Sequence, residues 1–238
     1  MDAKVRRVGV LELDAFPTGL YEEIAAALPE AEVVDGSDTF AAARAVLDDA
    51  EAKLLARADA IASAALPDAG SAADVGDAVG AVERAARRER AEEAYIAIAP
   101  DFDADRRFQR LSGAQPLARR FAIRATIAYK GCWVRRIQTF DREDRQAFVR
   151  TDAWFDSLTR SMDSTRPLQP QIAAALAKLP AAHLVHWMAE SVVGTRPLAV
   201  VASSEAPDAP LPPVPALILT LSLTVEGKAW CGARLAAP

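Results

Sequence analysis

The chain has 238 residues, of which 51% are hydrophobic, so it carries enough apolar surface for one large core and is not disordered throughout. Its formal net charge of −5 argues against general nucleic-acid binding, because neutralising phosphates requires a basic face. The sequence shows no run of about 18 apolar residues and no secretory-signal pattern, and two cysteines are too few for a disulfide framework, so we expect a cytoplasmic protein without a membrane span.

The first 36 residues predict a small opening unit. Strands are expected at 5–13 and 31–34, on either side of a short helix at 17–28. A segment of this length is too short to form an independent core. We therefore place a boundary between residues 1–36 and the domain at 37–238.

Two helices are expected between residues 37 and 94. Ser37 and Asp38 are candidate N-caps for the first, which we extend to about residue 66, before Pro67. Apolar residues at intervals of seven, with others on the same stripe, predict one buried helix face. They are Phe40, Leu47, Leu54 and Ile61, with Ala43, Val46, Leu55 and Ala58. The second helix is expected from about 72 to 94.

The remaining elements repeat one order. A strand at 95–99 and an acidic loop at 101–105 lead to a hairpin at 121–140, which turns at Lys130 and Gly131. The later elements are helices at 142–162 and 169–178, strands at 182–188 and 197–203, and a hairpin of 215–225 with 227–234. Helix, helix, strand and hairpin therefore occur twice. This order predicts an α+β domain built from a duplicated half.

Two arginines interrupt the apolar pattern of the first hairpin. Arg124 and Arg135 lie five or six positions on either side of the turn, so we expect them to face each other on one side of the sheet. Like charges directly opposite each other destabilise a strand pair. The basic clusters at 84–90 and 118–120 are interleaved with acids or lie at element ends, and we interpret them as solvated faces.

Four segments in this order resemble the pita-bread family of creatinase, aminopeptidase P, prolidase and methionine aminopeptidase. Segment 31–66 resembles the junction between the family's N-terminal domain and first long helix, 183–194 its glycine-histidine segment and 215–223 its "PGMVLTVEP" motif. Segment 123–140 retains five residues of the family's hairpin pattern: Ile123, Tyr129, Gly131, Thr139 and Phe140.

The resemblance implies a fold and an assembly. It implies that 37–238 form a pita-bread domain, with a pseudo-two-fold duplicated half and a curved antiparallel sheet covered by helices. Residues 1–36 would then be a remnant of the family's N-terminal domain. Because the family usually dimerises, the resemblance also implies a homodimer, or a heterodimer with a paralogue.

The same resemblance argues against the family's metal chemistry. Its active members hold two metal ions with two aspartates, one histidine and two glutamates, an oxygen-rich set that suits hard cations. The aspartate positions fall on Arg124 and Arg135, the histidine on His186 and one glutamate on Ser222, while the last glutamate has no match. An auxiliary histidine of the family lines up with Arg107. We therefore expect no metal and no other cofactor.

Two interpretations of the arginines remain open. Arg107, Arg124 and Arg135 could converge on one cavity and bind a carboxylate, phosphate or sulfate, with Trp187 and Ser222 beside them. Alternatively, they could be paired internally with Glu190, Glu226 or an aspartate of the 101–105 loop, because buried charges need partners.

The sequence thus favours a metal-free, catalytically altered pita-bread protein, a pseudopeptidase that binds an anionic small molecule or a protein partner. One alternative is a metal-independent hydrolase or repurposed biosynthetic enzyme, in which His186 acts as the acid or base beside Glu190. His186 could equally be a relic without a chemical role. Another alternative is a structural subunit of a paralogous peptidase. Neither nucleic acid nor membrane is an expected partner.

Overall fold

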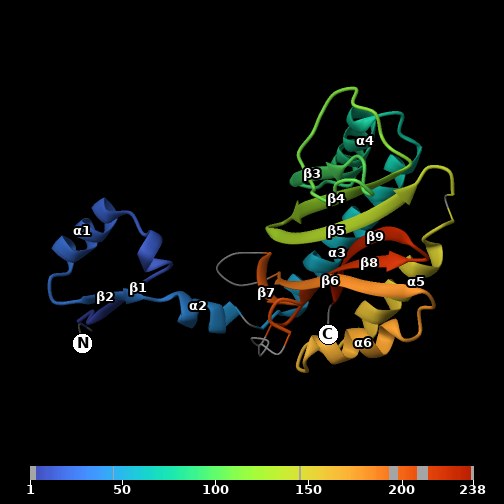
Figure 1. The fold of residues 1–238 in the computed structure, drawn as a ribbon. Helices are drawn as coiled ribbons and strands as arrows, with labels where there is room; N and C mark the ends of the chain where they lie inside the picture. Colours follow the sequence, from blue (N-terminus) through green and yellow to red (C-terminus); the bar gives the residue numbers. More distant parts are fainter. Residues whose placement is uncertain (1–3, 45, 145, 193–197, 208–213, 237–238) are drawn as a thin grey trace.

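The computed structural model describes residues 4–44, 46–144, 146–192, 198–207 and 214–236. Figure 1 shows a small N-terminal unit that stands apart from a larger body of helices and strands. No helix in these ranges is both long and apolar enough to cross a membrane.

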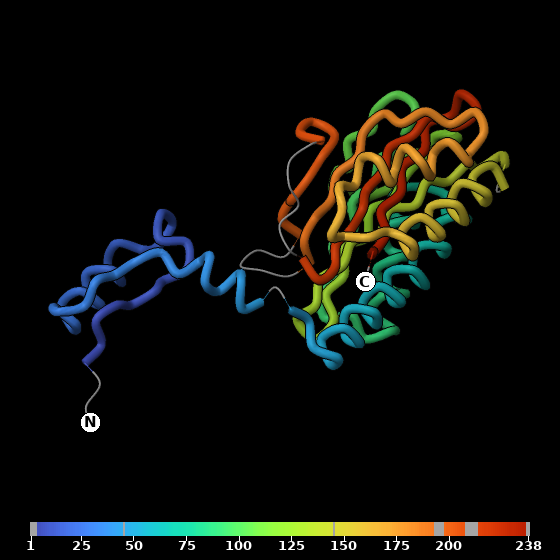
Figure 2. Tube along the Cα trace, turned by 90° about the horizontal axis from the view of Figure 1, so that it is seen from below, coloured from blue at the N-terminus to red at the C-terminus, as the bar shows by residue number. Residues whose placement is uncertain are grey.

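The N-terminal unit is a single strand-helix-strand motif. β1 (Arg7–Val10) pairs in parallel with β2 (Glu32–Asp35), and α1 (Thr18–Ala27) connects them after a short 3-10 turn, η1 (Leu13–Ala15). Within residues 4–44 only Val10 is buried. The unit therefore has almost no core of its own. α2 (Ser37–Arg44) leads from it toward the body (Figures 1 and 2).

The expected single helix from Ser37 to residue 66 is wrong, because the chain forms two helices there. α3 (Asp49–Ala65) begins afresh after Asp48, whose carboxylate accepts the Glu51 N–H at 2.7 Å. Before this cap Phe40 is 39% and Val46 is 76% exposed, whereas Leu47 packs against the core and is partly buried. The seven-residue spacing marks a buried face only beyond the break.

The other helices are shorter than expected for similar local reasons. η2 (Leu66–Ser71) precedes α4 (Val75–Arg88). α4 ends before the expected residue 94 because β3 (Glu93–Ala99) already begins at Glu93. α5 (Val149–Ser161) starts seven residues later than expected, since the Asp141 carboxylate accepts the N–H groups of residues 143 and 144 and holds a turn. α6 (Leu168–Leu176) follows.

Within the described residues, seven strands form one antiparallel sheet in the order β3-β4-β5-β9-β8-β6-β7. The remaining strands are β4 (Arg120–Tyr129), β5 (Cys132–Asp141), β6 (Ala182–Ser191), β7 (Ala199–Ser203), β8 (Leu217–Val225) and β9 (Lys228–Ala236). In the first half β3 pairs with the hairpin β4-β5, and in the second half β6 pairs with the hairpin β8-β9. The two halves join at β5 and β9, which confirms the duplicated α+β architecture.

Both hairpins turn in the same way. Lys130 and Gly131 have φ angles of 52° and 78°, and Glu226 and Gly227 have φ angles of 50° and 77°. Two consecutive left-handed residues are the signature of the two-residue turn that suits twisted antiparallel strands. The turn expected at Lys130 and Gly131 is thus confirmed.

The helices of both halves cover one face of the sheet (Figure 2). α3 packs on β4 and β5, α4 on β3, α5 on β9 and α6 on β6. Two arginines identify the helix-covered face: Arg136 of β5 pairs with Asp59 of α3 at 2.7 Å, and Arg234 of β9 pairs with Asp156 of α5 at 2.9 Å. Side chains alternate along a strand. Arg135 therefore points to the opposite face, which we call the inner face.

Candidate functional site

Arg124 and Arg135 both lie on the inner face, but not directly opposite each other. The β4-β5 register pairs Arg124 with Ile137 and Arg135 with Thr126. The two arginines are therefore diagonal neighbours, which stand farther apart than a directly opposed pair. This corrects the expected face-to-face placement and explains how the hairpin accommodates two like charges.

Arg135 has an internal partner. Its guanidinium donates to Glu190 Oε1 of β6 and to Thr126 Oγ1 at 3.3 Å. Glu190 is only 2% exposed, and this burial raises its pKa while the Arg135 charge opposes the rise. Glu190 is thus one of the internal partners that the sequence analysis considered, and it compensates the charge of Arg135.

Arg124 has no such partner in the described part of the chain. Its guanidinium lies over the Phe108 ring, 5.4 Å from the ring centre, and forms no ion pair with a carboxylate of the described residues. Burial and the neighbouring Arg135 charge both lower the pKa of Arg124. An arginine nevertheless stays charged in a protein. The inner face therefore holds a half-buried cation whose charge the described residues leave unpaired.

Two buried oxygens near these charges also lack hydrogen-bond partners within the described ranges. They are Glu190 Oε2 and Thr220 Oγ1. Thr220 lies on β8 opposite Met188, and Glu190 lies two residues along β6, so Thr220 and Glu190 are diagonal neighbours on the inner face. Buried polar atoms are nearly always hydrogen-bonded. Glu190 Oε2 and Thr220 Oγ1 are therefore exceptions among the buried side chains of the described ranges.

Arg107 does not join this cluster, although the sequence analysis placed it there. Its side chain is 83% exposed and pairs with Asp105 at 2.8 Å. The neighbouring Arg106 instead lies over the Phe102 ring, and its charge opposes the rise that burial causes in the pKa of Cys231. Phe108, the aromatic neighbour of Arg124, is not predicted by the sequence pattern. Nothing in an irregular loop reveals which side chain turns inward.

Trp187 lies in the core and not in a pocket. It is 1% exposed, alternates onto the helix-covered face, and its indole N–H donates to Gln169 of α6. Ser222 does lie on the inner face, opposite Cys231 in the β8-β9 register, with its Oγ 3.6 Å from Cys231 Sγ. Of the expected ligand-binding residues, the fold therefore gathers Arg124, Arg135 and Ser222 on one face.

His186 and Glu190 do not form an acid-base pair. They lie on the same strand four residues apart, a separation of about 13 Å along the backbone. His186 faces Ser222 in the register with β8, whereas Glu190 is bound to Arg135. Within the described ranges, no hydrogen bond or ion pair joins His186 to a carboxylate.

Cys231 lies on the same face as the arginines, and its thiol is expected to be unreactive. It is buried, and burial raises its pKa to about 11. Its backbone N–H and C=O both bind the Thr139 hydroxyl at 2.9 Å. Because the thiolate is the reactive form of cysteine, this residue is unsuited to nucleophilic chemistry.

The residues of the inner face do not fit a dinuclear metal centre. The two aspartate positions implied by the resemblance hold Arg124 and Arg135, whose charges repel cations. Ser222 and Cys231 stand opposite each other where oxygen-rich ligands would be needed. Within the part of the chain that the structure describes, no three His, Cys, Asp or Glu residues are grouped as a ligand set.

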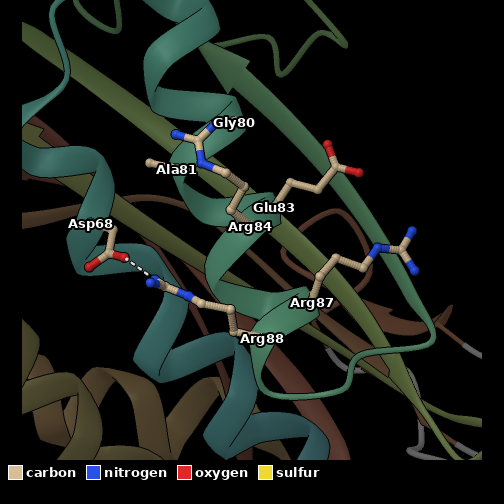
Figure 3. Close-up of a pocket in the computed structure, with 7 residues that line it drawn as sticks. All are labelled: Asp68, Gly80, Ala81, Glu83, Arg84, Arg87 and Arg88. Atoms are coloured by element: carbon tan, nitrogen blue, oxygen red, sulfur yellow. Dashed lines mark hydrogen bonds and ion pairs between the residues drawn. The ribbon is translucent and has the colours of Figure 1, made fainter.

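A separate surface basin of about 810 Å³ lies along α4 (Figure 3). Its lining includes Arg84, Arg87 and Arg88 together with Asp68 and Glu83, and Arg88 pairs with Asp68 at 3.3 Å. Arg87 also binds the backbone carbonyl of Glu92. Acids and carbonyls thus partner much of the basic charge, which agrees with the solvated face expected for 84–90 and gives no reason to place the function there.

No family model and no curated protein matches this sequence. Solved structures do. An X-Pro aminopeptidase from Thermotoga maritima superposes with a TM-score of 0.67 at 15% identity, over 98% of this chain and 70% of that chain. A prolidase from Pyrococcus furiosus superposes with a TM-score of 0.65 at 10% identity, over 98% of this chain and 73% of that chain. A variant of Escherichia coli aminopeptidase P superposes with a TM-score of 0.63 at 14% identity, over 98% of this chain and 64% of that chain.

Sequence identities this low show only that the folds are similar. The shared coverage and the duplicated antiparallel sheet agree with the four sequence segments that carried the resemblance. The chain has the pita-bread fold of the aminopeptidase P and prolidase structures, as a divergent version with arginines on its inner face.

Proposed function

We propose that this chain is a metal-free, catalytically altered pita-bread protein that binds an anionic small molecule on its inner face. The observation that carries the proposal is the state of Arg124: it is half-buried, beside a second arginine, and without a carboxylate partner in the described ranges. A buried charge is costly unless it is paired. An anion bound at Arg124 would supply the missing partner.

The local charge balance favours a monoanion. Arg124 and Arg135 carry two positive charges and Glu190 carries one negative charge, which leaves one positive charge in the cluster, because the nearby Arg106 is exposed and water screens its charge. Stacking on Phe108 uses the flat face of the Arg124 guanidinium. The N–H groups at the guanidinium edge remain suited to a bidentate carboxylate. A small carboxylate therefore fits better than a phosphate dianion.

Thermal denaturation tests the proposal. A ligand that binds only the native state raises its stability, by about 2.7 kcal/mol at a hundred times the dissociation constant. We expect acetate or propionate to raise the melting temperature of the wild type above that in sodium chloride of equal ionic strength, and Arg124→Leu to abolish the rise. Arg107→Leu, an exposed arginine with its own aspartate, is the matched control and should keep it. Equal responses in all three proteins would refute the proposal.

The N-terminal unit supports a second proposal, association with another polypeptide. Leu20 and Tyr21 of α1 are 49% and 42% exposed, and the two-stranded sheet beneath them has only Val10 buried within residues 4–44. Isolated two-stranded sheets are marginally stable. A second copy of the chain, as in a homodimer, or a paralogous subunit would cover this surface. Light scattering after size exclusion should then give a mass of at least two chains, and a monomer at micromolar concentration would contradict it.

A further inference from the structure

A cavity of about 260 Å³ lies on the helix-covered face of the sheet, where the two halves of the domain meet. η2 and the last residues of β5 line it from the first half, and the start of α5 lines it from the second half. Gln138 and Phe140 belong to its lining and alternate with Arg136 along β5, so they point toward the helices. The cavity is slightly smaller than pockets for drug-sized molecules, which hold about 300 Å³ or more. It can therefore hold a small organic molecule.

Asp152 offers this cavity a carboxylate oxygen that no described residue uses. The Trp230 indole N–H and the Arg234 guanidinium both contact Oδ1, at 3.2 and 3.5 Å, and no hydrogen bond within the described ranges reaches Oδ2. The side chain is 24% exposed, and Oδ2 is not among the enclosed oxygens, so a ligand atom can reach it. Gln138 and Ser71 also line the cavity, and their side chains form no hydrogen bond with another described residue.

The charges around Asp152 leave one negative charge in excess. Arg234 lies 3.5 Å from Asp152 and 2.9 Å from Asp156, so that one guanidinium serves two carboxylates. Arg136 is already paired with Asp59 at 2.7 Å. These two arginines thus face three aspartates. Because opposite charges attract more strongly where water is partly excluded, the excess favours a cation as the ligand.

The other charged residues of the lining leave this preference unchanged. Asp141 is paired with Arg119 and Arg120, and Asp144 lies 3.9 Å from Lys228. Among the residues that the structure describes, no arginine or lysine lines the cavity. The same ranges contain no group of three possible metal ligands, so the cavity does not fit a metal ion. An organic cation fits it better.

Part of the lining is apolar and suits an alkyl chain. Phe140, Phe148 and Val149 supply this part. An alkylammonium ion matches both parts of the cavity, because its charged end donates three hydrogen bonds, as a lysine side chain does, and its alkyl chain buries apolar surface. A small amine therefore uses the free acceptors and the apolar wall together.

We infer that this cavity binds a small alkylammonium ion, whose ammonium group donates to Asp152 Oδ2 and to the Gln138 carboxamide oxygen. The cavity lies on the opposite face of the sheet from Arg124. The inference therefore does not depend on the anion binding proposed for the inner face.

Calorimetric titration of the full chain with butylammonium chloride at pH 8 tests the inference. Asp152→Asn keeps an oxygen for Trp230 and should weaken the binding at least about tenfold, because a charge-assisted hydrogen bond becomes a neutral one. Gln138→Leu should weaken it about threefold. Asp156→Asn is the matched control, since Asp156 also contacts Arg234 but does not line the cavity, and it should change the affinity by less than about threefold.

Acid should weaken the binding as well. Burial raises the pKa of Asp152 to about 6, while Arg234, Trp230 and Arg136 oppose the rise and the Asp156 charge adds to it. Below that pH the carboxyl is protonated and attracts a cation weakly, whereas an alkylamine is protonated at pH 5 and at pH 8. The wild-type affinity should therefore be about tenfold lower at pH 5 than at pH 8, and Asp152→Asn should show no such change.

Equal affinities of the wild type and Asp152→Asn would overturn the inference, because the ligand would then bind elsewhere. Binding of 1-butanol as tight as that of butylammonium would overturn the assignment of a cation. Absence of butylammonium binding at millimolar concentrations would mean that water fills the cavity. If Asp152→Asn does not fold, an unchanged affinity in Gln138→Leu together with equal wild-type affinities at pH 5 and pH 8 would overturn the inference. Arg124→Leu should bind butylammonium like the wild type, which separates this cavity from the inner face.

Discussion

Arg124 and Arg135 are diagonal neighbours on the inner face, yet only Arg135 is neutralised by a carboxylate within the described ranges. The loss of Arg135 should therefore affect the stability of the fold differently from the loss of Arg124. Loss of Arg135 would leave Glu190 buried and unpaired. Loss of Arg124 would relieve a like-charge contact and forfeit little besides the stacking on Phe108.

The first prediction follows from this asymmetry. Arg135→Leu should lower the free energy of unfolding by roughly 3–5 kcal/mol, because breaking one side of a buried ion pair strands the other charge. Arg124→Leu should change it by no more than about 1 kcal/mol in a buffer without carboxylates, the range of one cation–π contact. Urea denaturation measures both. A loss at Arg124→Leu as large as at Arg135→Leu would mean that Arg124 has an internal partner.

The second prediction concerns Asp152 of α5, which accepts the Trp230 indole N–H at 3.2 Å and lies 3.5 Å from the Arg234 guanidinium. Burial raises the pKa of Asp152 to about 6, while Arg234, Trp230 and Arg136 oppose the rise and the Asp156 charge adds to it. Between about pH 4 and 6 the folded chain then holds this proton more tightly than the unfolded chain. Stability from this group should therefore fall as the pH rises through that window.

The total change from Asp152 should be roughly 3 kcal/mol, since each pKa unit corresponds to about 1.4 kcal/mol. Asp152→Asn keeps an oxygen acceptor for Trp230 and should flatten the pH dependence between about pH 4 and 6. Urea denaturation of both proteins at several pH values gives the comparison. Parallel profiles for wild type and variant would show that Asp152 titrates normally.

The third prediction separates the two cysteines. Cys132, at the start of β5, is partly exposed, whereas Cys231 is buried, and burial raises the pKa of both thiols. A thiol reagent near pH 8 should modify Cys132 first and Cys231 only when the protein unfolds. Cys132→Ser should therefore remove the early phase of the reaction. Rapid modification of Cys231 in the native protein would contradict the packing of β8 on β9.

The fourth prediction concerns metals. Because guanidinium groups occupy the inner face, Mn²⁺ or Co²⁺ should leave the melting temperature unchanged, and a chelator should have no effect. Elemental analysis provides the direct count. About two divalent ions per chain, with a peptidase activity that disappears on their removal, would show that the centre is built from residues other than those identified.

The fifth prediction concerns the N-terminal unit. A chain that starts at Val46 keeps Asp48, the cap of α3, and every strand of the seven-stranded sheet. Its melting temperature should stay within a few degrees of the full chain, because the unit contributes almost no buried surface. A collapse of the circular dichroism signal on truncation would mean that the unit supports the body.

Local chemistry carried much of the fold prediction. Turn residues predicted the Lys130-Gly131 turn, and side-chain periodicity predicted the repeated order of helices and strands. The break at Asp48 could not be foreseen, because spacing alone does not show whether an apolar stripe has a surface to pack on. In the candidate site, Arg124 and Arg135 were predicted because they interrupt the apolar pattern of the hairpin and fall on motif positions of the family, although their expected face-to-face register was wrong.

Other parts of the site depend on contacts between residues far apart in the sequence. The pairing of Arg135 with Glu190 spans 55 positions, and several carboxylates were plausible partners. Arg106 and Arg107 are neighbours in an irregular loop, where no alternation rule indicates that Arg106 lies over Phe102 while Arg107 pairs with Asp105. Trp187 sits beside His186, but adjacent strand residues face opposite sides of the sheet.

The most direct test of the central claim is a crystal soaked in sodium bromide, because bromide is a monoanion that anomalous scattering locates without ambiguity. Anion binding at Arg124 predicts a bromine peak within hydrogen-bond distance of the Arg124 guanidinium, on the side away from Phe108. It also predicts that the peak is absent in Arg124→Leu. A wild-type map with no bromine at Arg124, or with a transition metal there after a manganese soak, would contradict it.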